Sequence, residues 1–502
     1  MLTRNTQNLN MYARTFLGED AVTEIIFEKS VKGMTGVSIT DENLDSALSE
    51  IKPQFLRKEP PVLPELSELE VMRHFKELSD KNFCVESGFY PLGSCTMKYN
   101  PKVNEYLAAL EGFTNLHPLQ NDKDSQGALE LMYNLQEALK TITGMDAITL
   151  QGSAGAHGEL CGMMIVKHYF KTIGDTKRTK VIIPDSAHGT NPASASICGF
   201  EIVKVQSNSK GLVDIEHLKE LFEQNKGEIA AIMMTNPNTL GLFEQDILTI
   251  SKLAHGEGVL LYYDGANLNA IMGITNPKVM GFDIVHVNLH KTFSTPHGGG
   301  GPGSGPVGVV EKLKDYLPVP VIDKKDGEYF RNYNLKNTIG KIKEFQGNFG
   351  VLVKAYAYIL MRGYTLKDAS CDAVLNANYI KEKLKPYYDL PYDTTCMHEF
   401  VLSGDRQKAD GVHTLEIAKR LIDYKFHPPT VYFPLIVSEA IMIEPTESEN
   451  KKRLDDFIDA MIKIAKEVKE NPQEVLSAPH CAPVKRVDET NAARHLDLRY
   501  KQ

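Results

Sequence analysis

Six short apolar runs, separated by stretches with helical periodicity, constrain the fold of this chain more than any other feature. They span residues 147–150, 181–184, 201–205, 229–234, 259–263 and 284–288. Apolar strands that alternate with helices form a parallel sheet, because the crossover helices bury both of its faces. We therefore expect an α/β domain with a mostly parallel sheet flanked by helices. Ligands of such sheets bind beyond the carboxyl ends of the strands, so the residues that follow each run are the first candidates for a site.

The sequence on either side of these runs differs in character, which suggests three parts. Residues 1–120 contain four prolines between positions 53 and 64. Proline lacks an N–H and restricts φ, so we expect an N-terminal arm and extended segment there. Residues 121–362 are expected to form the large α/β domain, with a first helix over 128–143 that stops at Gly144. Residues 363–502 form the third part.

The third part is expected to be a smaller α+β domain. The pattern predicts helices over 366–384 and 415–424, strands over 398–402 and 440–444, and a last helix. Thr446 and Glu449 have the Thr-x-x-Glu spacing of a capping box, which predicts the start of that last helix.

Composition excludes several classes of function. The chain has 502 residues, 42% of them apolar, and a formal net charge of −9, which argues against a nucleic-acid partner because phosphate binding needs a basic surface. Seven scattered cysteines without a Cys-x-x-Cys pair are typical of reduced thiols. We see no apolar signal segment and no stretch long enough to span a membrane, so we expect a soluble, cytoplasmic protein without a membrane partner.

The first strand end is followed by a run of small residues. Positions 151–159 read Gln-Gly-Ser-Ala-Gly-Ala-His-Gly-Glu and open a helix. Backbone N–H groups and the dipole at a helix N-terminus favour an anion such as a phosphate. A plain glycine-rich turn would have the same composition, so both interpretations stay open on this run alone.

Two further strand ends carry polar residues that suit an aromatic ligand. His188 follows the second run and can lie flat against a ring, although a lone histidine is more often structural. Thr239 lies in the turn Thr-Asn-Pro-Asn-Thr after the fourth run. Its hydroxyl can reach a ring substituent, but turn chemistry explains these residues equally well.

The last two strand ends carry a carboxylate and an amine. Asp264 directly follows four apolar residues, where its charge needs a match such as a protonated pyridine nitrogen; a helix N-cap is the structural alternative. Lys291 follows the sixth run, and lysine is seldom buried unless it is paired or used covalently. Burial favours the neutral, nucleophilic amine that Schiff-base formation requires. We therefore predict that Lys291 binds pyridoxal 5'-phosphate as a Schiff base.

Two other patterns do not point to a separate site. The glycine-rich run 298–306 lacks the Gly-Lys-Ser/Thr that closes a Walker loop, and a flexible connector remains one interpretation of it. No group of cysteines and histidines has the spacing of metal ligands, so no metal is expected.

Longer motifs make the chain resemble one known family. Residues 288–303, Asn-Leu-His-Lys-Thr-Phe-Ser-Thr-Pro-His-Gly-Gly-Gly-Gly-Pro-Gly, resemble the lysine signature of the glycine cleavage system P-proteins, the decarboxylating glycine dehydrogenases. Segments 88–101, 184–194, 263–270 and 482–489 are similar to other motifs of that family. The resemblance covers about residues 60 to 490. In length and motifs the chain looks like the second subunit of the two-subunit form.

The resemblance implies the fold of pyridoxal-phosphate-dependent transferases of fold type I. It implies that Lys291 is the Schiff-base lysine, that Asp264 faces the pyridine nitrogen and that His188 stacks on the ring. It also places Ser153, Ala154 and Gly155 in the phosphate loop. Further cofactor contacts are expected from Thr239, Ala266 and His290.

The same resemblance implies an activity and partners. The expected reaction is decarboxylation of glycine with transfer of the aminomethyl group to the lipoyl arm of an H-protein. A separate subunit 1 is implied, with two copies of each subunit. The residues themselves leave two alternatives open: another pyridoxal-phosphate-dependent decarboxylase or aminotransferase, and a non-catalytic assembly subunit. An aminotransferase typically needs an arginine for the substrate carboxylate.

Overall fold

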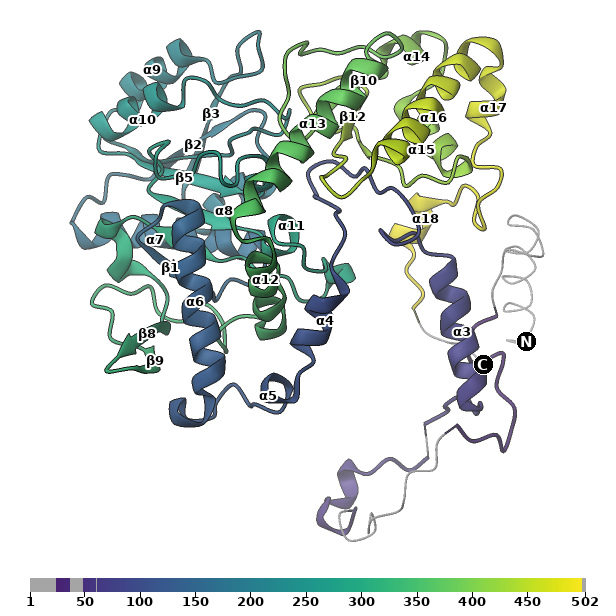
Figure 1. Cartoon of the computed structure of the whole chain (residues 1–502), viewed down its shortest axis with the longest axis horizontal. Helices are drawn as coiled ribbons and strands as arrows, with labels where there is room; N and C mark the ends of the chain where they lie inside the picture. Colours follow the sequence, from purple (N-terminus) through teal and green to yellow (C-terminus); the bar gives the residue numbers. More distant parts are fainter. Residues whose placement is uncertain (1–23, 37–47, 60, 499–502) are drawn as a thin grey trace. The chain divides into compact units, whose positions relative to one another are not determined.

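The computed structural model describes residues 24–36, 48–59 and 61–498. The chain divides into two compact units, Gly88–Ser477 and a second unit that combines Met1–Ser87 with Ala478–Gln502 (Figure 1). The three-part division with boundaries at residues 120 and 362 stays a prediction. Within the described part of the chain, no helix is long and apolar enough to cross a membrane.

A seven-stranded sheet forms the centre of the larger unit. Its strands are β1 (Ala147–Thr149), β2 (Lys180–Pro184), β3 (Glu201–Val205), β4 (Ile229–Met234), β5 (Leu260–Gly265), β6 (Ile284–Val287) and β7 (Val307–Val309). Their order in space is β1-β7-β6-β5-β4-β2-β3. The pairs from β6 to β3 are parallel, whereas β7 is antiparallel to both of its neighbours. The predicted mostly parallel sheet is confirmed, and β7 lies outside the six predicted runs.

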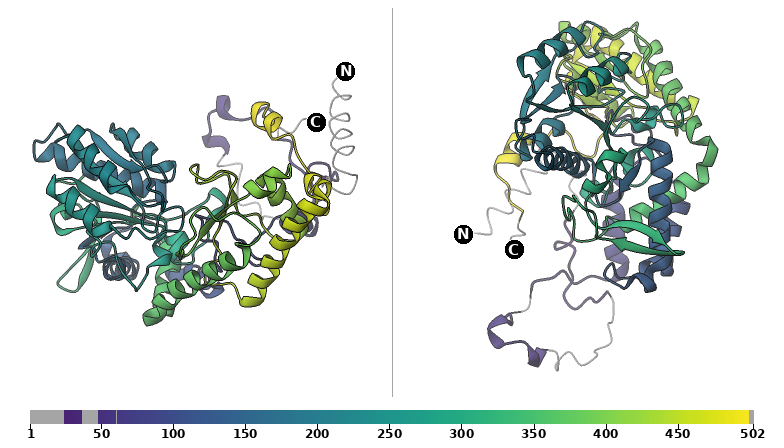
Figure 2. Two further views of the ribbon diagram at one scale, coloured as in Figure 1. Left: turned by 90° about the horizontal axis from the view of Figure 1, so that it is seen from above. Right: turned by 90° about the vertical axis from the view of Figure 1, so that its left-hand side faces the viewer.

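Helices cover both faces of this sheet (Figure 2). They are α6 (Gln126–Thr143), α7 (Gly155–Thr172), α8 (Thr190–Ile197), α9 (Ile215–Gln224), α10 (Ile247–Gly256) and α12 (Phe349–Arg362). Leu261 and Tyr263 of β5 belong to one hydrophobic core with α6 and α10, whereas Leu260 and Tyr262 belong to another with α7. Successive side chains of a strand point to opposite faces, so both faces of β5 are buried. This double coverage explains why the strands are unbroken apolar runs in the sequence.

The chain from α13 (Leu366–Leu384) onward builds a smaller sheet with its own core. Its antiparallel strands are β10 (Phe400–Ser403), β11 (Thr430–Val431) and β12 (Ala440–Ile443), in the order β10-β12-β11. The helices of this part are α14 (Asp405–Ala409), α15 (Thr414–Asp423), α16 (Lys451–Glu470) and α17 (Pro472–Leu476). The helices and strands predicted for this region are therefore present, with ends that differ by one or two residues in most cases.

The start of α16 differs from the prediction. Its N-cap is Asn450, whose side chain accepts a hydrogen bond from the N–H of Arg453. Thr446 has a φ of 63°, a left-handed conformation, whereas an N-cap residue has an extended backbone. The capping box at Thr446 and Glu449 was therefore the wrong interpretation of that spacing.

Shorter elements complete both units. The larger unit also contains α4 (Lys102–Ala108), α5 (Glu111–Thr114), α11 (Leu289–Thr292) and the hairpin β8 (Val321–Lys325) to β9 (Glu328–Asn332). The second unit contains α3 (Glu68–Asp80) and α18 (Glu489–Arg494). Ser67 caps α3, and within the same unit Lys29 forms an ion pair with Glu77 at 3.0 Å.

Candidate active site

A cavity of about 190 Å³ lies at the carboxyl ends of β4, β5 and β6. Six residues singled out in the sequence line it: Gly155, His188, Thr239, Asp264, Ala266 and Lys291. The other lining residues are Ser94, Ala156, Glu159, Thr190, Thr235, Asn267 and Asn288. Ser153, Ala154 and His290, which were also expected at the site, are not among the residues that line the cavity.

Lys291 and Asp264 reach this cavity from adjacent parallel strands. Lys291 lies on α11, directly after β6, and its Nζ donates a hydrogen bond to the carbonyl oxygen of Ser94 at 2.6 Å. Asp264 ends the apolar part of β5 and is only 3% exposed. Its Oδ1 accepts from the N–H of Ala266 at 3.0 Å and lies 3.2 Å from Nε2 of His286. A buried carboxylate and an amine thus face the same small volume.

His188 follows β2 and is an exposed side chain at the edge of the cavity. Its Nδ1 lies 3.1 Å from the hydroxyl of Thr190, and its ring meets the ring of Phe433 edge-on, with centroids 5.4 Å apart. Partial desolvation, with the positive charge of Lys291 nearby, lowers the pKa of His188 below its ordinary value. The imidazole is therefore neutral at neutral pH.

Glu159 is a site residue that the sequence patterns did not single out. It lies on α7, faces the cavity, and accepts hydrogen bonds from the hydroxyls of Thr190 at 2.9 Å and Ser194 at 3.0 Å. Burial, with Asp264 close by, raises the pKa of Glu159 to about 7. The available signal was a glutamate one turn into a helix that continues Leu-Cys-Gly-Met-Met-Ile-Val, since a buried carboxyl group in an apolar helix needs an explanation.

The start of α7 approaches its neighbours too closely for larger side chains. A Cβ on Gly155 would lie 2.7 Å from Oδ1 of Asn288, and a Cβ on Gly305 would lie 2.1 Å from the carbonyl oxygen of Ala154. Oδ1 of Asn288 is buried and has no hydrogen-bond partner within the part of the chain that the structure describes. At Gly305 the glycine-rich run thus packs directly against the loop that precedes α7. The small residues of both segments allow backbone N–H groups to face the cavity at a helix N-terminus.

Ser153 and His290 form hydrogen bonds within the segments that flank the cavity. Oγ of Ser153 lies 3.3 Å from Nδ1 of His157. Nδ1 of His290 accepts from the N–H of Ser304 at 3.3 Å. Burial lowers the pKa of His290 to about 3, so its imidazole is neutral. Both residues hold the loops around the cavity in the structure.

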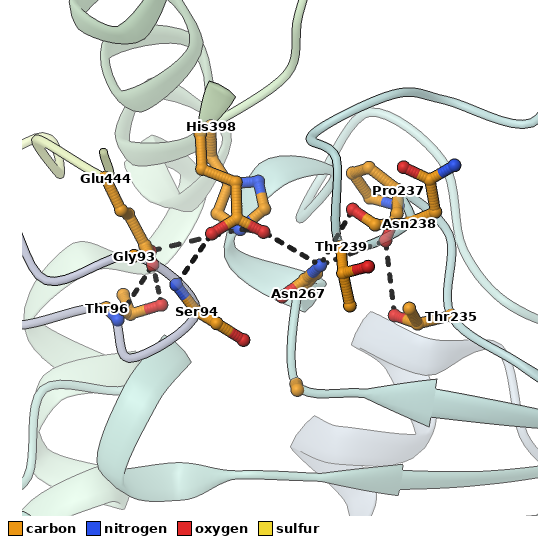
Figure 3. A network of polar contacts seen from close by, with 12 residues as sticks. Gly93, Ser94, Thr96, Thr235, Pro237, Asn238, Thr239, Asn267, His398 and Glu444 are labelled. Carbon is orange, nitrogen blue, oxygen red and sulfur yellow. Dashed lines mark hydrogen bonds and ion pairs between the residues drawn. The ribbon is translucent and has the colours of Figure 1, made fainter. Parts of the chain in front are cut away.

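A second buried cluster holds the turn that carries Ser94 (Figure 3). Glu399, just before β10, accepts the N–H of Ser94 at 2.7 Å, and Glu444, just after β12, accepts the N–H of Thr96 at 2.9 Å. Nε2 of His398 lies 3.7 Å from Glu399 Oε1 and 3.9 Å from Glu444 Oε1. Burial, with Glu444 beside it, raises the pKa of Glu399 well above its ordinary value. Burial therefore favours the protonated form of Glu399 more than it would be favoured in water.

A larger cavity of about 280 Å³ lies elsewhere, lined mainly by apolar residues such as Phe113, Met132 and Phe349. Arg331 faces it but is already bound to Asp122 and to the carbonyl oxygen of Pro118. The convergence of titratable groups distinguishes the cavity at Lys291 as the candidate active site.

Solved structures with the same fold define the class. Glycine decarboxylase (P-protein) of the glycine cleavage system, in inhibitor-bound form, has a TM-score of 0.69 at 18% identity over 84% of this chain and 95% of that chain. The cysteine desulfurase CsdA from Escherichia coli has a TM-score of 0.58 at 13% identity over 78% of this chain and 98% of that chain. These identities show the fold alone. It is the fold-type-I fold of pyridoxal-phosphate enzymes, which confirms the expected fold class.

Sequence relatives identify the family. The profile of the glycine cleavage system P-protein matches residues 29–335, and that of the glycine dehydrogenase C-terminal domain matches residues 369–483. The probable glycine dehydrogenase (decarboxylating) subunit 2 of Listeria innocua is 58% identical over 481 residues, 95% of this chain and 98% of the relative. Its counterpart in Caldanaerobacter subterraneus is 57% identical over 479 residues, again 95% and 98%. The chain belongs to the glycine cleavage system P-protein family, as its motifs predicted.

Proposed function

We propose that this chain is the catalytic subunit of a glycine dehydrogenase (decarboxylating). It releases the carboxylate of glycine as CO₂ and passes the remaining aminomethyl group to the lipoyl arm of an H-protein. The observation that carries the proposal is the meeting of the Lys291 amine and the buried Asp264 carboxylate in one cavity. The sequence relatives of the chain are named as probable glycine dehydrogenases (decarboxylating).

The residues around the cavity fit pyridoxal 5'-phosphate. Lys291 offers an amine for the aldehyde, Asp264 a carboxylate for the pyridine nitrogen, and the start of α7 backbone N–H groups for the phosphate. Asn288 lines the same cavity, packs closely against Gly155, and has a buried Oδ1 without a hydrogen-bond partner among the described residues. When bound, the coenzyme supplies an electron sink for the bond that breaks at the α-carbon of glycine.

The chain's own groups prepare this chemistry. Asp264, kept out of solvent beside the neutral His286, favours a cation opposite its carboxylate. The carbonyl oxygen of Ser94 accepts a hydrogen bond from the Lys291 amine. This contact holds the amine at the cavity when the amine is not bound covalently. Glu399 holds Ser94 in turn, through its N–H.

The cavity disfavours an aminotransferase. Among the residues that line it in the described part of the chain, none is an arginine. Arg331 is bound to Asp122, and Arg362 lies over the ring of Tyr358. Loose binding of the substrate carboxylate suits a reaction that removes this group. The presence of both Lys291 and Asp264 at the cavity disfavours a non-catalytic assembly role.

Partners follow from the same proposal. The name of the relatives implies a subunit 1, and we place two copies of each subunit in the complete enzyme, with lipoylated H-protein as the acceptor. Seven scattered cysteines without a Cys-x-x-Cys pair suit a reducing compartment such as the cytoplasm.

Borohydride reduction tests the proposal directly. The purified chain is incubated with pyridoxal phosphate, reduced and digested, and its peptides are mapped. We expect a visible absorption band that disappears on reduction and a pyridoxyl group on Lys291. Lys204→Ala, a change at an exposed lysine of β3, is the matched control and should be labelled as the unchanged chain is.

Activity is the second readout. With subunit 1 and lipoylated H-protein present, the chain should exchange labelled bicarbonate into the carboxyl group of glycine. A protein that stays colourless with added coenzyme, or a label on another lysine, would reject the proposal and favour an assembly role.

A further inference from the structure

A chain of three polar side chains runs from His188 to a buried carboxyl group. Nδ1 of His188 lies 3.1 Å from Oγ1 of Thr190, and this hydroxyl donates to Oε1 of Glu159 at 2.9 Å. A hydroxyl has a single proton to donate. If Thr190 gives it to an ionised Glu159, the hydroxyl oxygen accepts from His188, so the imidazole proton is on Nδ1 and Nε2 has a free lone pair.

Protonation of Glu159 reverses this order. The acid then donates to Oγ1 of Thr190, the Thr190 hydroxyl donates to Nδ1 of His188, and the imidazole proton is on Nε2. The backbone N–H of Thr190 also points at Nδ1, at 3.4 Å, which favours this second arrangement. The geometry therefore accommodates both tautomers.

We propose that His188, Thr190 and Glu159 form a proton relay in which Glu159 stores a proton taken from the cavity. An N–H bond forms at Nε2 of His188 as the N–H bond at Nδ1 breaks. That proton passes to Oγ1 of Thr190, whose own proton passes to Oε1 of Glu159. The proton donor is an ammonium group in the cavity, such as that of an amino-acid substrate. One proton enters the relay, and no group is oxidised or reduced.

The surroundings of Glu159 suit a carboxyl group that gains and loses a proton near neutral pH. Burial and the neighbouring Asp264 favour its protonated form, whereas Lys291 and the hydroxyls of Thr190 and Ser194 favour its ionised form. The balance gives Glu159 a pKa of about 7. Two other groups lie against it from the sheet: Tyr262, whose hydroxyl lies 2.7 Å from Nδ1 of His286, and His286 itself, which is neutral because burial lowers its pKa.

Glu159 acts through His188 and is thus a positioning residue whose use in catalysis rests on the proposed function. The relay itself is tested on the full chain without coenzyme. Nitrogen NMR of chain labelled in its histidines distinguishes Nδ1–H from Nε2–H, and His188→Gln assigns the signal. We expect the His188 proton to move from Nδ1 to Nε2 as the pH falls through about 7. Double protonation of His188 follows only at lower pH, since its own pKa is lowered.

Three variants separate the relay from simple packing. Glu159→Gln and Thr190→Val should each abolish the change of tautomer near neutral pH. Ser194→Ala, which removes a hydroxyl from the other carboxylate oxygen, should keep the change and displace it to higher pH. Infrared detection of the protonated carboxyl group should show Glu159 still titrating in Thr190→Val, which also reports that this variant is folded.

The relay is overturned if His188 keeps one tautomer through this pH range in the unchanged chain. It is also overturned if Thr190→Val behaves as Ser194→Ala does. Because neither readout involves coenzyme or glycine, a failure of the relay and a failure of the proposed function are distinguishable.

Discussion

Two buried clusters in this protein contain the same kinds of side chain, namely two carboxyl groups and one histidine. In the cluster of Glu159, Asp264 and His286, as in the cluster of His398, Glu399 and Glu444, the polar atoms lie within 4.8 Å of one another. Their hydrogen-bond partners differ. Glu159 accepts from the side-chain hydroxyls of Thr190 and Ser194 beside the cavity. Glu399 and Glu444 each accept a backbone N–H of one turn, and Glu444 also accepts the hydroxyl of Thr96 from that same turn.

The types of residue in a cluster do not by themselves assign a role to a buried acid. Hydroxyl partners can rotate and exchange protons, so the first cluster is suited to moving a proton. Backbone N–H groups are fixed in the chain, so Glu399 and Glu444, which accept them, are suited to holding the turn that carries Ser94 and Thr96. Ser94 connects the second cluster to the cavity, because its N–H is bound to Glu399 and its carbonyl oxygen accepts from Lys291.

Lys291→Ala should have the largest effect on function. Removal of the amine that the coenzyme needs is expected to lower glycine-dependent exchange by roughly 10³-fold or more. The free energy of unfolding, measured in urea, should change by less than about 1 kcal/mol, because the amine makes one hydrogen bond to the described residues. A large loss of stability instead would place Lys291 with the structural cluster.

Glu399→Ala should have the largest effect on stability. It leaves the N–H of Ser94 buried without an acceptor and opens a cavity, so we expect a loss of about 3 kcal/mol in the free energy of unfolding. Glu399→Gln keeps the size of the side chain and an acceptor oxygen for this N–H, at a position where burial raises the pKa of the carboxyl group and so disfavours its charge. This matched variant should lose less than about 1 kcal/mol. Equal losses in urea denaturation would contradict the role of Glu399 as the acceptor for the N–H of Ser94.

Glu159→Gln should change how stability depends on pH. The pKa of Glu159 rises from 4.5 in the unfolded chain to about 7 in the folded one, so the folded state binds the proton more tightly. The contribution of Glu159 to the free energy of unfolding is fully present below pH 4.5. It decreases as the pH rises and is lost above about pH 7. The fall amounts to about 3 kcal/mol, since one pKa unit corresponds to about 1.4 kcal/mol. The Glu159→Gln variant should lack this loss of stability. The measurement is the free energy of unfolding at pH 4.5 and at pH 7 for the variant and for the unchanged chain.

Ser194→Ala should have the smallest effect. It removes one hydrogen bond to the Glu159 carboxyl group and nothing from the second cluster, so the expected loss of stability is about 1 kcal/mol. Because that hydrogen bond lowers the pKa of Glu159, the infrared titration of the carboxyl group should shift to higher pH. A titration that does not move would show that Ser194 only fills space.

Residues with strong local signals were found from the sequence. The strands β4 and β5 are buried on both faces, so their apolar runs are visible without any knowledge of their neighbours. By contrast, β7 is a Val-Gly-Val segment of three residues. It becomes a strand only because β1 and β6 provide hydrogen bonds on both sides, and such pairing over long chain distances has no local pattern.

The candidate site divides in the same way. Lys291 and Asp264 are charged residues directly after apolar strands, which is rare enough to be noticed in sequence. Glu159 also had a signal, as an acid inside an apolar helix. Glu399 and Glu444 had none, because the N–H groups that they bind lie 305 and 348 positions away in the chain.

The sequence by itself thus determined the succession of most strands and helices along the chain. It also identified Lys291 and Asp264 at the strand ends and the family to which the chain belongs. The pattern of apolar residues and the chemistry of each side chain are local properties, so they can be identified in the sequence without a structure. Only the tertiary structure decided which acids hold protons and which residues orient Lys291 and His188. Those properties depend on desolvation and on partners from distant segments, and both arise only when the chain has folded.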